Sequence, residues 1–436
     1  MNDRTPSLKY AWYVVAVLTL ANVSGFVDRQ ILSLLVVPIR RDLGISDTQM
    51  SLLMGLSFAL FYTVLGLPIA RWADRGSRRG LLVVGVAMWS VMTGLSGLAA
   101  TFPLLLLARV GVGVGEATLA PTSTSLLADY FPREMLGRAL SVYGLGVFLG
   151  SGLAYVIGGQ IVGLVSDRGL WTLPLVGAVH PWQTVFFFIG APGLLIALLM
   201  FTVKEPRRAE GTGAAVPIGE VFGYLRANSR TFTLQSLGFA LSATVNYGIA
   251  AWLATFLIRT YGWTATRAGT VQGALTMTIG VVGTLAGGWM SDRWVRAGRV
   301  DGPLLVGITG AAGMLVSATA YPLMASAWAA VAWLAVVNFF AALPWGAASA
   351  AAAEIVPARI RAQGIALYFL VLSLVSGVLG PFAVAFLTDH VFGRDSALGW
   401  SLAIVNVVGM SLAIALLWAA RGSYRETVSR LQQQQH

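Results

Sequence analysis

Long apolar stretches recur along the whole chain and set its expected architecture. A helix needs about 20 apolar residues to cross the roughly 30 Å hydrocarbon core of a bilayer, and runs of that size recur from residue 10 to residue 420. The run 302–353 is too long for one helix, and Tyr321-Pro322 with Ser326 marks a turn that divides it. The pattern predicts an all-α membrane protein with twelve transmembrane helices. They are expected within 10–37, 48–70, 80–108, 101–128, 139–166, 169–203 after Pro181-Trp182, 231–258, 268–291, 302–353 (two helices), 362–388 and 396–420.

Composition excludes most classes of soluble protein. Of the 436 residues, 57% are hydrophobic and only 11% are charged, and the mean hydropathy is +0.76. A soluble domain carries about 25% charged residues, so this chain lacks the polar side chains needed to cover a water-facing surface. Soluble enzymes, disordered chains and nucleic-acid-binding domains are therefore poor interpretations. We expect a multi-pass integral protein of a plasma or inner membrane, present as a monomer.

Residue types that carry enzyme or cofactor chemistry are scarce. The chain has no cysteine, and its three histidines lie outside the apolar segments, so no HExxH-type metal site exists. No GxxxxGK[ST] phosphate loop is present, which excludes ATP as the energy source. An intramembrane enzyme needs a nucleophile with a base, or a metal cluster, at membrane depth. The sequence therefore predicts neither an enzyme nor a cofactor nor a metal site.

The net charge of +11 reflects where Lys and Arg lie relative to the membrane. They cluster in alternate segments between the predicted helices, above all in 71–79, 204–230, 293–299 and 421–430. The positive-inside rule places these segments in the cytoplasm, and both termini with them. Anionic lipid headgroups then account for the basic excess, and no nucleic-acid partner is expected.

The longest polar stretch, Lys204–Arg230, divides the chain near its middle and is typical of a linker between two halves. An internal repeat supports the division. Asp129–Pro132 after the fourth helix parallels Glu354–Pro357 after the tenth, and Tyr143 aligns with Tyr368 at the same offset of 225. Related halves are the mark of a duplicated transporter. The expected domains are an N-terminal six-helix half at 1–203, a cytoplasmic linker at 204–230, a C-terminal six-helix half at 231–421 and a cytoplasmic tail at 422–436.

Two six-helix halves, with a DRxxRR-like loop after the second helix and an echo after the eighth, resemble the major facilitator superfamily. The loop is Asp74-Arg75-Gly76-Ser77-Arg78-Arg79, and its echo is Asp292-Arg293. Within that superfamily, Asp28-Arg29 and the string Arg109-Val-Gly-Val-Gly-Val-Gly-Glu116 resemble the spinster branch. The likeness covers the whole chain. It implies a transporter that works by alternating access, and the branch is associated with lysosphingolipid and lysophospholipid transport. The usual Gly four residues before the loop aspartate is Ala70 here.

Four ionisable residues lie at membrane depth, where each costs about 2.5–3.5 kcal/mol on insertion scales and needs a partner or a wet cavity. Arg109 and Glu116 are seven residues apart, so they share one helix face at about 10 Å of rise, and Asp28 is the natural partner for one of them. Arg29 points about 100° away from Asp28 around the first helix. The sequence leaves open whether Arg29 reaches the outer interface or braces that helix.

Asp28, Arg109 and Glu116 are the candidate substrate and proton site. Opposite charge lowers the pKa of a carboxyl group while desolvation raises it, so its protonation becomes sensitive to conformation. The hypothesis is that protonation of Asp28 frees Arg109 to bind an anionic headgroup as a bidentate clamp, with Glu116 biasing the equilibrium or relaying the proton. The alternative is a permanent ion pair between two helices, although buried pairs are weak stabilisers that packing can replace.

Two further groups of residues are candidates for supporting roles. The charges near the loops are expected to form an interhelical gate, with a solvated charge run as the alternative. The neutral polar and aromatic residues are candidates for cavity lining, with packing or interfacial placement as the alternative. The gating candidates are Asp74, Arg75, Arg78, Arg79, Asp129, Arg138, Asp292, Arg293 and Glu354, and the lining candidates are Asn246, Tyr247, Asn338, Trp345, Tyr143 and Tyr368.

The sequence thus favours a proton-coupled secondary active transporter of an amphipathic, anionic lipid of the sphingosine-1-phosphate or lysophospholipid type. Its expected partners are that substrate, protons and the surrounding lipids. A proton-coupled carrier of a hydrophilic organic anion or drug is the first alternative. A membrane receptor is the second, but a receptor is expected to carry a sizeable extramembrane domain, and only the linker and a short tail are long enough to be considered.

Overall fold

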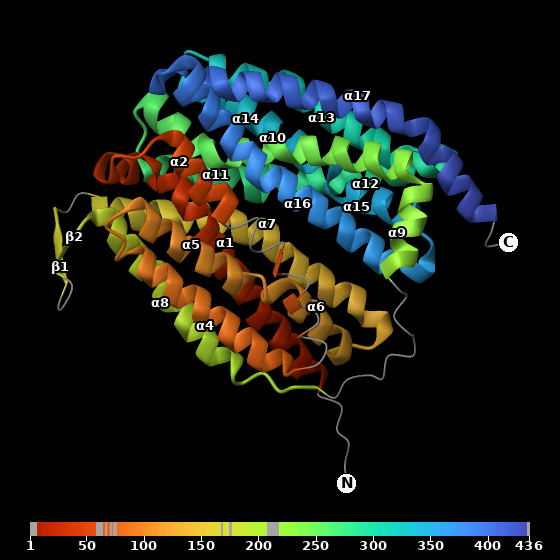
Figure 1. The fold of residues 1–436 in the computed structure, drawn as a ribbon, viewed down its shortest axis with the longest axis horizontal. Coiled ribbons are helices and arrows are strands. Elements are labelled where there is room, and N and C mark those ends of the chain that lie inside the picture. The colour runs from red at the N-terminus through yellow and green to blue at the C-terminus, as the bar shows by residue number, and fades with distance from the viewer. Residues whose placement is uncertain are drawn as a thin grey trace, which may run out of the picture. The chain divides into compact units, whose positions relative to one another are not determined.

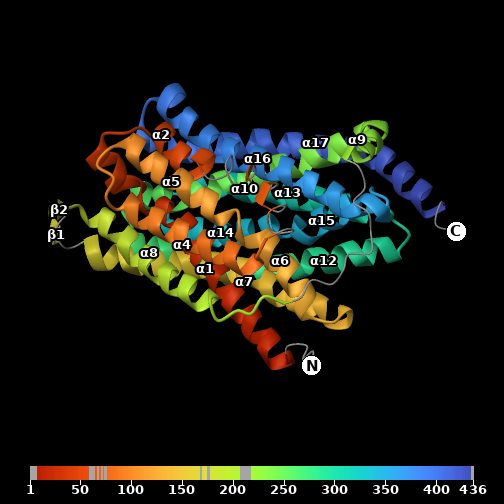
Figure 2. The same cartoon turned by 60° about the horizontal axis from the view of Figure 1, so that its bottom comes forward.

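The computed structural model consists of long helices and, among the described residues, one two-stranded hairpin (Figures 1 and 2). The structure describes residues 7–57, 64–65, 68–69, 72, 76–166, 169–173, 177–206 and 218–433. Within these residues, 11 helices are long and apolar enough to cross a membrane. The helix predicted at 48–70 is helical over Asp47–Ser51 and Leu52–Leu56, but residues 58–63, 66–67 and 70 lie outside the described residues, and it is not among the 11.

Helix bounds follow the labels of Figure 1. The helices are α1 (Leu8–Leu43), α2 (Asp47–Ser51), α4 (Arg78–Ser96), α5 (Phe102–Glu116), α6 (Leu119–Tyr130), α7 (Arg133–Ser166), α8 (Pro181–Met200), α9 (Ile218–Ala227), α10 (Ser229–Tyr261), α11 (Ala265–Leu275), α12 (Val281–Arg296), α13 (Gly302–Ala320), α14 (Ala327–Ala342), α15 (Pro344–Glu354), α16 (Arg361–Phe386) and α17 (Leu398–Gln433). The strands are β1 (Trp171–Leu173) and β2 (Gly177–Val179), and they pair antiparallel.

Two helix boundaries predicted from the sequence are confirmed. Helix α13 ends in a short 3₁₀ turn at Tyr321–Leu323, and α14 begins directly after Ser326. Helix α8 begins at Pro181, where proline is tolerated because the first helical N–H has no partner within the helix. Proline therefore marked both positions in the sequence.

The ends of the second half carry more helix than the sequence analysis expected. Helix α9 lies within the polar stretch 204–230 because Val221 and Leu225 form an apolar stripe that is buried in the adjoining core. Helix α17 continues to Gln433, and Tyr424 and Val428 are buried in the same core. Both additional helical segments carry a short apolar stripe at helical spacing. The charged residues beside each stripe make it hard to recognise in the sequence.

The chain forms two compact units, each with its own core. Unit 1 contains Met1–Glu210 and Leu253–Met277, and unit 2 contains Gly211–Trp252 and Thr278–His436. The core of unit 1 gathers Val14, Leu18, Leu82, Trp89 and Val112 among others, and that of unit 2 gathers Leu304, Ile355, Tyr368, Leu417 and Tyr424 among others. The segment 253–277 belongs to unit 1 by its contacts, although it follows the linker in the sequence.

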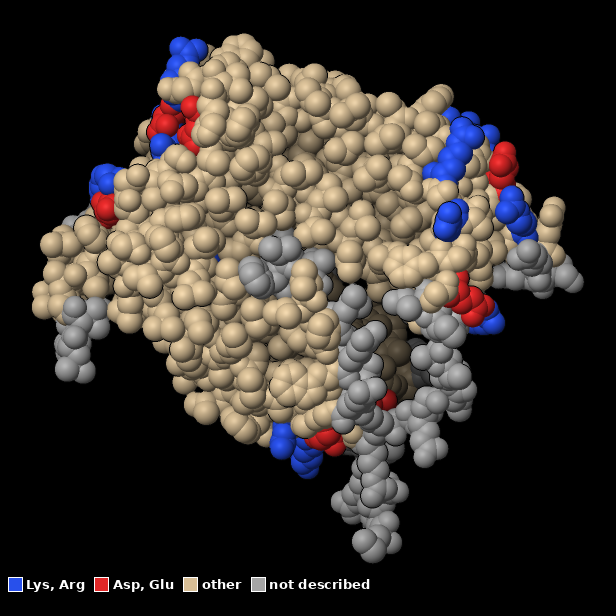
Figure 3. Space-filling view, viewed as in Figure 1, with Lys and Arg blue, Asp and Glu red and all other residues tan. Residues whose placement is uncertain are grey.

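The surface is apolar over wide areas. On the face drawn in Figure 3, uncharged residues cover most of the surface, and charged side chains gather near its margins. Large apolar side chains are exposed on both units, such as Leu107 (68%), Leu164 (70%) and Leu285 (69%). In water this exposure would promote aggregation, whereas in a bilayer these side chains contact lipid tails.

Glycines allow α7 and α11 to cross within backbone contact inside unit 1. A Cβ atom added to Gly273 would overlap the carbonyl oxygen of Gly152, and one added to Gly269 would overlap that of Tyr155. Thr266 Oγ1, at the start of α11, donates a hydrogen bond of 2.9 Å to the carbonyl of Gly159. Small residues at such crossings let membrane helices gain close packing where no hydrophobic driving force exists.

The Gly273→Ala substitution should lower the melting temperature, because the added methyl group forces α7 and α11 apart. Overpacking of this kind costs about 1–3 kcal/mol. The matched control is Gly288→Ala in α12, where an added Cβ has no atom within 4 Å. The control should be neutral or slightly stabilising, since alanine favours helix over glycine. Thermal unfolding in detergent measures both variants, and equal melting temperatures would contradict the proposed close crossing.

Candidate functional site

The four intramembrane charges predicted from the sequence meet between α1 and α5 in unit 1, where their side chains form ion pairs. Arg109 Nη1 donates a short hydrogen bond to Asp28 Oδ1, and Nη2 donates to the backbone carbonyl of Asp28 at 3.2 Å. Both side chains are almost completely buried. The structure therefore brings Asp28 together with Arg109 as an ion pair.

A second ion pair joins the same two helices. Arg29 Nε lies 2.5 Å from Glu116 Oε2, so consecutive residues of α1 bind residues seven apart on α5. Glu116 is buried, whereas the Arg29 side chain is 29% exposed, with its guanidinium 5.2 Å from the centre of the Phe26 ring. The sequence analysis did not pair Arg29. The sequence did hold a signal, because Asp28 and Arg29 together offer one charge of each sign to the two charges of opposite sign on α5.

Two buried polar atoms of this site, Glu116 Oε1 and Arg109 Nε, have no hydrogen-bond partner among the described residues. The Glu116 carboxylate lies close to α1, since a Cβ added to Gly25 would be 3.5 Å from its Oε2, an ordinary van der Waals distance. Buried atoms without partners are unusual, since each costs about 1–3 kcal/mol, and functional sites are where they persist.

Thr93 of α4 is a member of the site that sequence reasoning missed. Its hydroxyl donates a short hydrogen bond to Asp28 Oδ2, and the residue is 1% exposed. A threonine in an apolar helix carries no signal of such a role, because hydroxyl groups in helices ordinarily bond to their own backbone. Only the tertiary structure, which brings its hydroxyl to Asp28, identifies it.

The polar face of α1 continues toward α7. Gln30 Oε1 accepts a hydrogen bond of 2.8 Å from the hydroxyl of Tyr155, which is 2% exposed. One turn further, the carbonyl of Ser33 accepts a hydrogen bond from Thr255 of the segment 253–277. Residues 28, 29, 30 and 33 of α1 thus each bond to a different partner, which makes α1 the hub of the polar contacts in unit 1.

A third buried carboxylate lies where α1 meets α2. Asp47 is fully buried, and Arg259 at the end of α10 contacts both of its oxygens at 2.7 and 2.8 Å. Arg40 Nε approaches the same carboxylate at 3.2 Å. The sequence analysis counted Arg40 and Arg259 only as orientation charges. Two arginines on one buried carboxylate hold the segment 253–277 against α1 and α2.

The loop charges expected to form a gate are only partly described. Asp74 and Arg75 lie outside the described residues. Arg78 is 2% exposed, donates a short hydrogen bond to Asp129 Oδ2, and pairs with Glu205 at 3.0 Å through Nε. Arg78 is therefore an interhelical tie between α4, α6 and the start of the linker, rather than a solvated charge.

Glu205, which follows α8, caps the start of α4. Its carboxylate accepts hydrogen bonds from the backbone N–H groups of Arg78 (3.3 Å) and Arg79 (2.8 Å) and from Ser77 Oγ (3.0 Å). Burial raises the pKa of this carboxyl group, but these hydrogen bonds and the Arg78 side chain outweigh burial, so the pKa lies below its ordinary value. The start of the linker is bonded to α4 in this way.

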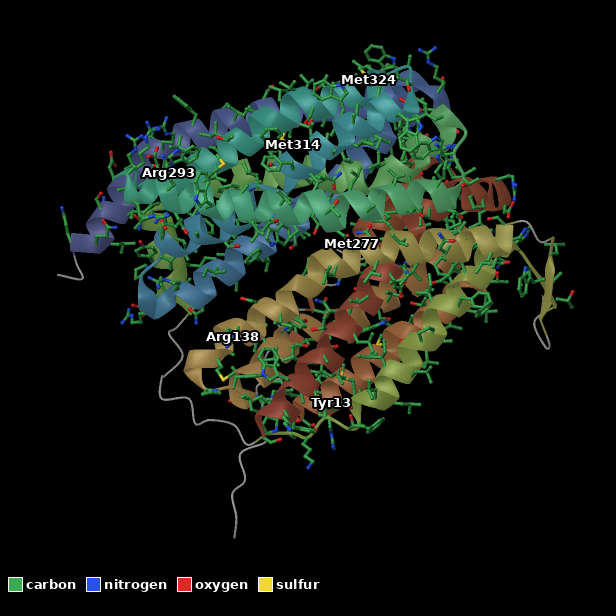
Figure 4. The ribbon with its side chains drawn as sticks, turned by 180° about the vertical axis from the view of Figure 1, so that it is seen from behind. Tyr13, Arg138, Met277, Arg293, Met314 and Met324 are labelled. Atoms are coloured by element: carbon green, nitrogen blue, oxygen red, sulfur yellow. The ribbon has the colours of Figure 1, made fainter. Side chains whose placement is uncertain are left out.

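Of the remaining gating candidates, Arg138 belongs to unit 1, and Asp292, Arg293 and Glu354 belong to unit 2. Arg138 in the first turns of α7 and Arg293 in the last turn of α12 are labelled in Figure 4, and both are exposed. The guanidinium of Arg293 lies 5.7 Å from the centre of the Trp289 ring, and Asp292 is exposed. Glu354 accepts a hydrogen bond of 2.6 Å from the hydroxyl of Tyr424 within unit 2.

Five of the six neutral lining candidates belong to unit 2, four of them besides Tyr368. The side-chain amides of Asn246 and Asn338 donate to carbonyls one turn back in their own helices. Tyr247 is 46% exposed and Trp345 is 52% exposed. Within their own unit, these side chains form no cluster comparable to the four charges of unit 1.

Tyr143 and Tyr368, the repeat-related tyrosines, both lie in cores. Tyr143 belongs to the core of unit 1 and Tyr368, fully buried, to that of unit 2. The Tyr368 hydroxyl has no hydrogen-bond partner within the protein. Equivalent sequence positions therefore have equivalent burial in the two units. Among the described residues, no group of three His, Asp or Glu side chains could hold a metal ion.

Comparisons with known proteins identify relatives over nearly the whole chain. Residues 18–320 match the Major Facilitator Superfamily. An MFS-type efflux pump of Mycolicibacterium smegmatis is 30% identical over 96% of this chain and 94% of its own length. Protein spinster homolog 1 of Bos taurus is 32% identical over 70% of this chain, which spans only 58% of that protein. The crystal structure of a bacterial homologue of the human lysosomal transporter Spinster, inward-facing and unoccupied, matches with a TM-score of 0.81 and 30% identity over 98% of each chain.

Replacing Glu205 with Gln should reduce stability near neutral pH but not at low pH. Because the pKa of the folded state is depressed, the ionised carboxylate stabilises the fold above the unfolded value of about 4.3, and this contribution is lost as pH falls through the folded pKa. Thermal unfolding at stepped pH should show a difference in melting temperature that is largest near pH 7. Glu426→Gln, at an exposed position of α17, is the control. A difference that does not change with pH would contradict the assignment.

Proposed function

Because this chain belongs to the major facilitator superfamily and is a spinster-like transporter, we propose that it is a proton-coupled secondary active transporter of an amphipathic, anionic lipid. The chemistry of the lipid is that of a lysophospholipid or a phosphorylated sphingoid base, with one anionic headgroup and one long tail. A single observation carries this proposal. Two ion pairs, Asp28–Arg109 and Arg29–Glu116, join two membrane helices.

The proposed topology is two six-helix halves, twelve helices in all, with both termini in the cytoplasm. Basic residues in alternate connecting segments support this orientation. The halves are residues 1–203 and 231–421, joined by the linker 204–230 and followed by the segment 422–436. Alternating access then consists of the two halves rocking about a site near the bilayer midplane.

Stability alone is a poor reason to bury these four charges. A buried ion pair is often replaceable by apolar packing at no cost, whereas removing one partner costs about 3–5 kcal/mol because the other charge is left unpaired. The pairs are therefore better explained as charges that exchange partners during a transport cycle. A substrate anion on the arginine together with a proton on the carboxylate can separate each pair without leaving an isolated charge.

Arg29 is the cation that first meets the substrate in this proposal. Its guanidinium is partly exposed, whereas that of Arg109 is enclosed by Asp28. A phosphate headgroup that binds Arg29 as a bidentate partner displaces Glu116. Glu116 is then buried without a counterion, a condition that favours its protonated form. Substrate binding and proton uptake are coupled by this exchange.

Asp28 and Arg109 form the second stage. Protonation of Asp28 removes the counterion of Arg109, which becomes able to bind the anion more deeply. The contacts of Asp47 with Arg259 and Arg40, which hold the segment 253–277 against α1 and α2, must break and reform as the halves rock. The gating residues Arg78, Asp129 and Glu205 act at the opposite, cytoplasmic end.

A second candidate is the export of a hydrophilic organic anion or drug, favoured by the relative described as an MFS-type efflux pump, which matches nearly the full length of this chain. The two candidates share the proton site and differ in the cargo. Proteoliposomes loaded with lysophospholipids, sphingosine-1-phosphate or soluble organic anions, with and without a pH gradient, distinguish them. Flux of soluble anions alone would exclude the lipid assignment.

The Asp28→Asn substitution should abolish accumulation driven by a pH gradient in these proteoliposomes. Asparagine has the shape of a protonated aspartate and cannot release a proton, so exchange of substrate without a gradient should persist. Arg109→Ala should remove transport of anionic lipid. Gradient-driven accumulation by Asp28→Asn, or unchanged lipid transport by Arg109→Ala, would remove the basis of the coupling mechanism.

Arg29→Gln should raise the KM for an anionic lysophospholipid by about 10- to 100-fold, the value of a charge-assisted hydrogen bond of about 1.5–3 kcal/mol. Arg29→Lys should retain part of the affinity, because it keeps the charge and loses the bidentate geometry. Arg41→Gln is the matched control, since the Arg41 side chain is 73% exposed at the end of the same helix. Equal KM values for Arg29→Gln and Arg41→Gln would assign headgroup binding elsewhere.

A further inference from the structure

Thr93 differs from the other buried hydroxyl residues of α4. Ser90 and Ser96, one turn to either side, donate to backbone carbonyls of their own helix at 2.7 Å (Val86) and 3.0 Å (Met92). All three residues are at most 2% exposed. Thr93 instead donates its hydroxyl to Asp28 Oδ2. The ordinary acceptor for its hydroxyl, the carbonyl four residues back, belongs to Trp89.

Close packing of α8 against α4 fixes the rotation that turns Thr93 toward α1. A Cβ added to Gly190 would lie 2.8 Å from the carbonyl oxygen of Ser90, and one added to Gly193 would overlap the Ser90 hydroxyl. These glycines let the α8 backbone contact one face of α4 near Ser90. Thr93 therefore lies on α1 because of how three helices pack, and its bond to Asp28 is not a chance surface contact.

The two oxygens of Asp28 have different partners. Oδ1 accepts a hydrogen bond from the guanidinium of Arg109, which is not deprotonated in proteins and carries a full positive charge. Oδ2 accepts from the neutral hydroxyl of Thr93. A proton that binds Oδ1 would meet the N–H of Arg109, whereas a proton on Oδ2 meets an oxygen that can reverse its role from donor to acceptor.

We propose that Thr93 is a positioning residue that sets the pH at which Asp28 takes up its proton and directs that proton to Oδ2. In the ionised state the Thr93 hydroxyl donates to Oδ2. When Oδ2 is protonated, its O–H donates to Thr93 Oγ1, and the Thr93 hydroxyl proton turns to the carbonyl of Trp89. No proton is gained or lost by Thr93, and every hydrogen bond has one donor and one acceptor in both states. The inference rests on the proposed proton coupling at Asp28.

The hydroxyl favours the ionised form of Asp28. A hydrogen bond to a charged acceptor is worth about 1.5–3 kcal/mol, and one between neutral groups about 0.5–1.5 kcal/mol. The other charges near Asp28 are Arg109 and Glu116 on α5 and Arg29 on its own helix, and none of them is altered by changing Thr93. Removal of the hydroxyl should therefore raise the pH of half-maximal proton uptake by about 0.5–1 pH unit, at 1.36 kcal/mol per unit.

The test uses Thr93→Val, which keeps the size and branching of the side chain and removes only the hydroxyl. The chain contains no cysteine, so nitroxide labels can be placed at Ser141→Cys in unit 1 and Val295→Cys in unit 2. Double electron–electron resonance on the reconstituted full chain then gives the pH midpoint of the change in the label-to-label distance distribution. Thr93→Ser should restore the wild-type midpoint, because it restores the hydroxyl.

Two controls separate the possible results. Ser96→Ala removes a buried hydroxyl that bonds only to its own helix, and it should leave the midpoint unchanged. Asp28→Asn should show no pH-dependent change, alone or combined with Thr93→Val. A wild-type distribution that does not change with pH would overturn the proposed coupling and this inference together. A wild type that titrates, with Thr93→Val at the same midpoint or with Ser96→Ala shifted equally, would overturn this inference alone.

Discussion

The mutual neutralisation of four charges between α1 and α5 is the interaction on which the chemistry of unit 1 depends. Two charges on consecutive residues of α1 are neutralised by two charges seven residues apart on α5, so Asp28 and Arg29 reach Arg109 and Glu116 without leaving an isolated charge. In a bilayer this cancellation is the condition for all four residues to exist at that depth. Helices α4 and α7 add polar partners, since Thr93 donates to Asp28 and Tyr155 donates to Gln30.

Glycine makes the arrangement sterically possible. Gly190 and Gly193 let α8 contact α4 at Ser90, one turn before Thr93. Gly269 and Gly273 do the same for α11 against α7. Membrane helices gain little from burial of apolar side chains, so close backbone contact and interhelical hydrogen bonds supply the specificity instead. A composition of 50 glycines is consistent with this type of packing.

Unit 1 has further polar contacts on either side of the four intramembrane charges. From Asp28 the bonded series on α1 runs through Gln30 and Ser33 toward Asp47, whose carboxylate holds Arg259. At the other end, Arg78 ties α4 to α6 and, through Glu205, to the linker. Helix α1 itself, which carries Asp28, is bonded near its start by Tyr10 to the carbonyl of Thr202 and near its end by Arg40 to Asp47. This is the physical basis on which protonation and helix movement can be connected in a transporter.

The sequence determined the membrane setting, the helical class, the turn at Tyr321-Pro322 and the identity of the four intramembrane charges, because apolar runs of spanning length and charges within them have few physical interpretations. It did not determine the partner of Arg29, the role of Thr93 or the contacts of Asp47, nor the helices at 218–227 and 422–433. Those depend on how helices rotate and cross, and a neutral hydroxyl or a single apolar stripe has the same sequence signal whichever neighbour it faces. Only the tertiary structure brings residues 28 and 93, or 47 and 259, within hydrogen-bonding distance.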